Sequence, residues 1–406
     1  MTHCSPCRSL APAGLADLVQ RDLTPSRILV VLLGVLSLLG CTPAPPPDTP
    51  PAAAIAFDDL NGFLTELETA RHDPAAWAER LNATDPDLAV AAEQIRANLA
   101  QFDVRFTATG DTHPLTTPAR GGAAATVHGV DVDWAVPGHP PATHRLWFTL
   151  TTRQTGLLLV GLTDGPATDP VPLWALGPVQ VAGGAQAAVL AGADVDVAPW
   201  LNDLGKALRT LEARGIGTSP LLVQVPAQPR DFQRLLGVRP TSHRAVAAVT
   251  WPFGAAAHVV INPQAALFGP TREVLVTHEA VHVATGSLRP GGPLWLAEGY
   301  ADLVALTGQP EVTAAHERHL ADDQRRHGIA TTLVTEADLD PDNPRVDAHY
   351  QRAWVTVRVL DRAGIADRIH AAVQAGTPLS QALAAEGWTE QSLAHAVTDE
   401  LTSKVG

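Results

Sequence analysis

The chain contains very little cysteine. Only three cysteines occur in 406 residues, and all of them, Cys4, Cys7 and Cys41, lie near the N-terminus. The sequence beyond Cys41 can therefore form no disulfide of its own, whichever compartment it occupies. The spacing of Cys4 and Cys7 imitates a redox or zinc pair, but no partner motif accompanies it. We assign this pair no function.

Positive charge is also scarce. The chain has 28 Lys and Arg against 42 Asp and Glu, a formal net charge of -14. This balance argues against nucleic acid or anionic lipid as a partner held by charge. Hydrophobic residues make up 46% and charged residues 17%, which is typical of a folded globular protein. A chain of this length can hold two domains, each with its own core.

One apolar run without charge occurs near the start, from Ile28 to Leu39, preceded by two arginines. This run is short for a spanning helix and suits the hydrophobic region of a secretory signal. The next residues complete Leu38-Leu39-Gly40-Cys41, which resembles a bacterial lipobox, and the resemblance implies that Cys41 is lipidated. We therefore expect residues 1–40 to be a signal peptide. The protein would then lie on the extracytoplasmic face of the cell membrane, lipid-anchored; the alternative is an ordinary signal anchor.

Residues 41–55 are rich in proline and alanine, which predicts a semi-rigid spacer. The following segment, 56–168, predicts three short helices and then four strands separated by Gly, Pro and Asp turns. Helices followed by an antiparallel meander indicate an α+β domain. The order of elements resembles that of NTF2-like folds, which often serve as binding or spacing modules.

Residues 169–406 predict a second domain with a mixed sheet and a largely helical C-terminal half. A hairpin at about 170–196 is expected to connect the two domains. Strands are predicted near 221–225, 245–251 and 258–262. A long helix is predicted to begin near Pro270 and to end at Gly286.

The most informative pattern lies on that helix and reads His278-Glu279-Ala280-Val281-His282. Residues four apart share one face of a helix, so both imidazoles can point at one atom. Glu298 follows on the next predicted helix. Two imidazoles, a third protein ligand and a position for water describe a catalytic zinc site, with Glu279 available as general base. The alternative is a buried helix with two hydrogen-bonded histidines and no metal.

This pattern, followed by Trp295-Leu296-Ala297-Glu298-Gly299-Tyr300-Ala301-Asp302, resembles the gluzincin branch of zinc metallopeptidases, the peptidase MA group of thermolysin-like enzymes. The resemblance implies a gluzincin-type domain whose zinc ligands are His278, His282 and Glu298. It also implies that Asp302 hydrogen-bonds His278. The link from His282 to Glu298 is shorter than in those enzymes, and the third histidine of the metzincin branch is absent.

Two residues are candidates for the group that stabilises the oxyanion, Tyr350 and His349. Both lie near the start of a helix predicted downstream of Glu298. The alternative is that Tyr350 packs and His349 is solvated. Tyr300 is expected to pack or to line a subsite. The resemblance also implies that strand 258–262 is the edge strand that pairs with an extended peptide. His258 on this strand is expected to be exposed, and the alternative is that it contacts substrate.

Further along the chain, a solvated helix face is expected to explain the histidines at positions 316, 319 and 327, and the alternative is a second metal site. The sequence as a whole predicts a membrane-anchored zinc metallopeptidase that hydrolyses peptide bonds of a peptide or protein substrate. The alternative, from another class, is a non-hydrolytic envelope protein that binds a peptide or protein partner. Hydrolysis of a non-peptide amide or ester is a third possibility.

Overall fold

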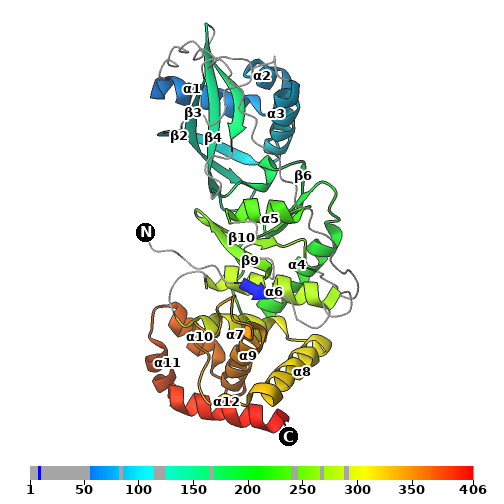
Figure 1. Ribbon diagram of the computed structural model, residues 1–406, viewed down its shortest axis with the longest axis vertical. Helices are drawn as coiled ribbons and strands as arrows, with labels where there is room; N and C mark the ends of the chain where they lie inside the picture. The colour runs from blue at the N-terminus through cyan, green and yellow to red at the C-terminus, as the bar shows by residue number, and fades with distance from the viewer. Residues whose placement is uncertain are drawn as a thin grey trace, which may run out of the picture.

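The computed structural model describes residues 8–10, 55–81, 86–113, 125–154, 156–163, 169–238, 246–265, 269–287 and 292–405. Within these ranges the chain forms twelve α-helices and two sheets, arranged along one long axis (Figure 1). The N-terminal module lies at one end, the second sheet in the middle and the C-terminal helices at the other end. The predicted spacer and the lipidation site Cys41 lie outside the described residues, as does the predicted signal peptide apart from residues 8–10.

The N-terminal module has the predicted order of helices first and strands second. Its helices are α1 (Phe57–Ala70), α2 (Pro74–Glu79) and α3 (Pro86–Leu99). Its strands form an antiparallel sheet in the order β2 (Asp103–His113), β3 (Ala125–Ala135), β4 (Ala142–Arg153) and β5 (Gly156–Thr163). Local sequence explains the start of α2, because the Asp73 side chain accepts hydrogen bonds from the backbone N–H groups of Ala75 and Ala76. The predicted α+β class is confirmed for this part.

The second sheet is mixed, as predicted. Its order is β9 (Val246–Phe253), β10 (Ala256–Ile261), β8 (Leu221–Val225), β7 (Ala187–Gly192) and β6 (Val179–Gly184). The short strand β1 (Arg8–Leu10) pairs antiparallel with the outer side of β9. Strand β8 pairs in parallel with both β10 and β7, whereas the β9–β10 and β6–β7 pairs are antiparallel. The hairpin expected only to connect the domains therefore adds two strands to this sheet.

The prediction that strand 258–262 is an edge strand is wrong. Strand β10 lies between β9 and β8 and pairs with both. The reason is the tight turn at Gly254, whose φ of +69° folds the chain back so that β9 covers the outer side of β10. His258 is consequently 3% exposed and was wrongly expected to be on the surface.

The two faces of the second sheet pack against different parts of the protein. On β8, Leu221, Val223 and Val225 belong to one core with the helices α4 (Ala198–Ala213) and α6 (Gly269–Thr285). Leu222 belongs to a second core, shared with α5 (Pro229–Leu236) and the N-terminal module. The alternation of side chains along a strand thus places the sheet between the module and the helices.

The C-terminal half is helical, as predicted. It comprises α7 (Leu294–Ala305), α8 (Pro310–His327), α9 (Val346–Arg362), α10 (Ala366–Gln374), α11 (Leu379–Ala385) and α12 (Glu390–Val405). Every residue of α7 after Leu294 is buried. Among the described residues no helix is long and apolar enough to cross a membrane.

Candidate metal centre

The two histidines of the helix motif and Glu298 come together inside the protein. His278 and His282 lie one turn apart on α6, and Glu298 reaches them from α7. Nε2 of His278 lies 3.0 Å from Nε2 of His282 and 3.2 Å from Oε2 of Glu298. The distance from Nε2 of His282 to the same oxygen is 3.6 Å. Within the described residues, these three are the only His, Cys, Asp or Glu group that brings three ligand atoms within 4.8 Å of one another.

These separations fit a tetrahedral ion. Zinc bonds of about 2.0–2.1 Å at tetrahedral angles place any two ligand atoms about 3.3 Å apart. The three observed distances lie on both sides of that value. The second oxygen of Glu298, Oε1, is buried and has no hydrogen-bond partner among the described residues. A divalent cation is the natural partner of such a cluster of nitrogen and carboxylate ligands.

The ring of His278 has a fixed orientation. Nδ1 of His278 lies 2.8 Å from Oδ1 of Asp302, one turn after Glu298 on α7. In the neutral ring, a hydrogen bond donated by Nδ1 to Asp302 leaves Nε2 without a proton and pointed at His282 and Glu298. By contrast, Nδ1 of His282 has no partner among the described residues.

Electrostatics favour positive charge in this group. Burial alone would lower the pKa of His278, but Asp302 and Glu298 raise it well above its ordinary value. Burial alone would raise the pKa of Glu298, but His282 and His278 lower it to about 2. These opposite pKa shifts favour a proton on His278 beside an ionised Glu298, and a bound metal ion would replace that proton.

Glu279 lies beside the ligands and takes no part in the ligand group. Its Oε2 accepts a hydrogen bond of 2.6 Å from the hydroxyl of Thr250 on β9. Its Oε1 is buried and unpartnered among the described residues. Burial raises the pKa of Glu279, against the opposing effect of the two histidines and of the Thr250 hydrogen bond.

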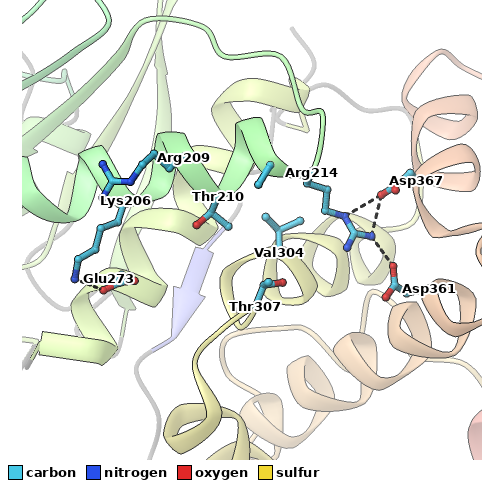
Figure 2. A pocket seen from close by; sticks show the side chains of 10 residues that line it. Lys206, Arg209, Thr210, Arg214, Glu273, Val304, Thr307, Asp361 and Asp367 are labelled. Atoms are coloured by element: carbon cyan, nitrogen blue, oxygen red, sulfur yellow. Dashed lines mark hydrogen bonds and ion pairs between the residues drawn. The ribbon is translucent and has the colours of Figure 1, made fainter.

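The group is closed to solvent. His278 is 2% exposed, and Glu279, His282 and Glu298 are 0% exposed. Two cavities are found elsewhere. One, of about 650 Å³, is lined in part by Lys206, Arg214 and Asp367. In its wall Lys206 forms an ion pair with Glu273, and Arg214 forms one with Asp367 (Figure 2). The other, of about 940 Å³, lies in the N-terminal module beside α1. Neither cavity is lined by a residue of the metal group.

The two candidates for the oxyanion donor are placed differently. His349 is 5% exposed, with Nδ1 3.1 Å from Nη1 of Arg352 and Nε2 3.8 Å from Oδ1 of Asp338. It is therefore not solvated, and its side chain lies against these two residues. Tyr350 is partly buried and packs against the core that contains α6 and α7. Its role as oxyanion donor stays a prediction.

Two residues near the metal group, Thr250 and His370, belong to no motif that would have predicted a place for them there. Thr250 is the single hydroxyl in the apolar stretch of β9 before Trp251, and only the fold brings it to Glu279. His370 on α10 stacks on Tyr300 with ring centroids 3.9 Å apart and an interplanar angle of 8°. Burial lowers its pKa to about 4, with His282 contributing. Tyr300 itself is packed, and its hydroxyl donates to Asp367 at 2.8 Å.

The fold and the site together define a mixed α/β protein with a buried His-His-Glu group that could hold a metal ion. Comparison of the chain with protein families, with curated proteins and with solved structures gives no match.

Proposed function

We propose that this protein is a membrane-anchored, extracytoplasmic zinc metallopeptidase of the gluzincin type with an NTF2-like N-terminal domain. The observation that carries the proposal is the convergence of His278 Nε2, His282 Nε2 and Glu298 Oε2, with Glu279 beside them. Three protein ligands leave one position of a tetrahedral ion for water. The export and lipid-anchor part comes from the sequence around Cys41.

The residues take the following parts in peptide hydrolysis. His278, His282 and Glu298 would hold the zinc, and Asp302 orients His278 through its hydrogen bond. Bound zinc would supply a water molecule whose pKa is lowered from about 16 to about 7. Glu279, through Oε1, takes the proton of the attacking water and returns it to the leaving amine. Tyr350 is the proposed oxyanion donor.

The competing function is a non-hydrolytic envelope protein. The burial of the metal group favours it, because residues that are 0–2% exposed give a substrate no access to the site. An intact Glu279 favours hydrolysis, since a structural site has no need of a buried carboxylate beside the ligands. Hydrolysis requires that the group opens to substrate.

A single set of measurements separates the two functions. The chain is purified, its zinc content is measured, and cleavage of a peptide library is followed with and without a chelator. We expect one zinc per chain, cleavage that the chelator abolishes, and a loss of at least about 100-fold in Glu279→Gln, which keeps the shape of the side chain. Full zinc content with no cleavage would exclude the peptidase and leave the binding protein.

A further inference from the structure

Thr250 is buried between the second sheet and the motif helix. It lies on β9, opposite Val259 on β10, and its side chain faces α6. Both Thr250 and Glu279 are 0% exposed. The two residues are 29 positions apart in the sequence, so their contact depends on the packing of α6 against β9.

The hydroxyl of Thr250 has two acceptors within reach. Oε2 of Glu279 lies at 2.6 Å and the backbone oxygen of Glu279 at 3.3 Å. A hydroxyl has one proton to donate, and the short contact to the carboxyl oxygen is the stronger of the two. The hydrogen bond therefore selects one carboxyl oxygen and fixes the rotation of the carboxyl group.

The two oxygens of Glu279 consequently differ. Oε2 is held by Thr250, whereas Oε1 is equally buried and has no hydrogen-bond partner among the described residues. A general base works through an oxygen that is free to accept a proton and is held at the right place. Oε1 meets the first condition, and the bond at Oε2 supplies the second.

From this geometry we infer that Thr250 is the positioning residue of Glu279 and that Oε1 is the oxygen that accepts the proton. The inference rests on the proposed function for its catalytic consequence. The contact itself belongs to this chain and is testable without any reaction. It also gives β9 a part in the site beyond its place in the sheet.

The activity test compares Thr250→Val, which removes the hydroxyl at nearly constant volume, with Thr250→Ser, which keeps it. We expect Thr250→Val to lower kcat about 10- to 100-fold with KM within about twofold, because the substrate and the metal are still bound but the base is misplaced. We expect Thr250→Ser to recover kcat to within about threefold of the parent. Zinc content is measured for each variant and should not change.

The matched control is Thr356→Val. Thr356 is 1% exposed, and its hydroxyl donates to the backbone oxygen of Arg352 within α9. This variant loses a buried hydroxyl without touching Glu279, and we expect its kcat to equal that of the parent. If Thr250→Ser lost as much activity as Thr250→Val, or if Thr250→Val kept the parental kcat, the positioning role would be wrong.

A readout that needs no activity is the urea unfolding of Thr250→Val, Glu279→Ala and the double variant. Removing the hydroxyl leaves a buried carboxyl group without its donor, which costs stability only while that carboxyl group is present. We therefore expect Thr250→Val to destabilise the parent more than it destabilises Glu279→Ala. Equal effects in both backgrounds would overturn the contact. A parent that binds zinc but cleaves nothing would contradict the peptidase proposal alone, and unfolding would still decide the contact.

Discussion

The hydrogen bond between His278 and Asp302 determines the orientation of the His278 ring within the candidate metal group. The contact of 2.8 Å to Nδ1 fixes both the ring orientation and the tautomer that exposes Nε2. Nδ1 of His282 has no such partner among the described residues, so its ring is held through its Nε2 contacts and by packing. The two histidines of the motif therefore differ in support, because only His278 has a hydrogen-bond partner at Nδ1 among the described residues.

Removing this support should weaken metal binding without abolishing it. We expect Asp302→Ala to lower the affinity for zinc about 10- to 100-fold, because loss of an outer partner of a metal-bound histidine has effects of this size. We expect His278→Ala to lower it further, since a ligand is lost. Competition with a chromophoric chelator measures both affinities.

The control for this comparison is Asp361→Ala. Asp361 forms an ion pair with Arg214 at 2.6 Å and lies outside the metal group. We expect it to bind zinc as the parent does. An unchanged affinity in Asp302→Ala would show that the hydrogen bond to His278 does not support the metal group.

At the level of elements, the position of Glu298 on α7 depends on the close approach of α7 to α9. A side-chain carbon added at Gly299 would overlap the carbonyl group of Ala353, whose carbon lies 2.6 Å from its position, and would also meet Val357. Glycine directly after Glu298 thus lets the two helices touch. Gly299 therefore serves the packing of α7 against α9, and Glu298 belongs to the candidate metal group.

We expect Gly299→Ala to destabilise the protein by about 1–3 kcal/mol, because the backbone of α9 must move. Gly205→Ala in α4 is the matched control, since the nearest atom to its added carbon is the end of Arg209 at 3.5 Å. The control should be stabilised by about 1 kcal/mol through helix propensity. Urea unfolding measures both changes. Equal effects of the two substitutions would show that α7 and α9 are not in close contact.

The sequence predicts most elements but not all their neighbours. The four-residue spacing on α6 and the short apolar run of β8 are local properties, and both elements are found as expected. The place of β10 inside the sheet depends on the pairing of distant segments, and the sequence pattern does not encode strand order. The contact of Thr250 with Glu279 and the complete burial of the ligands follow from tertiary packing and leave no periodic signal.

At the scale of the whole molecule, histidines form part of the junction between the N-terminal module and the second sheet. His144 on β4 stacks on Phe253 of β9 at 4.7 Å, and Nε1 of Trp134 donates to its Nδ1 at 3.1 Å. His258 on β10 lies 2.8 Å from the side chain of Gln224. Burial lowers the pKa of both histidines to about 3, so both are neutral in the folded protein near neutral pH.

This junction should make the protein sensitive to acid. An unfolded histidine, with a pKa near 6.5, takes up a proton as the pH falls below that value, whereas His144 and His258 stay neutral down to about pH 3. Unfolding is therefore favoured as the pH falls from 6.5 towards 3. Each histidine contributes about 1.4 kcal/mol per pH unit, or about 2 kcal/mol at pH 5.

The expected result is a shallower acid dependence in His144→Phe, which keeps an aromatic ring against Phe253 but cannot take up a proton. The unfolding free energy of this variant at pH 7 should be lower than that of the parent, because Trp134 loses its acceptor. Between pH 6.5 and 4.5 its unfolding free energy should fall less steeply with pH, because unfolding takes up one proton fewer. Urea unfolding of the metal-free protein in chelator keeps zinc release out of the measurement. His395→Gln removes a histidine that is exposed on α12 and should leave the slope unchanged. A parental slope in His144→Phe would mean that His144 takes up its proton in the folded protein, and the junction would then not be the source of the acid sensitivity.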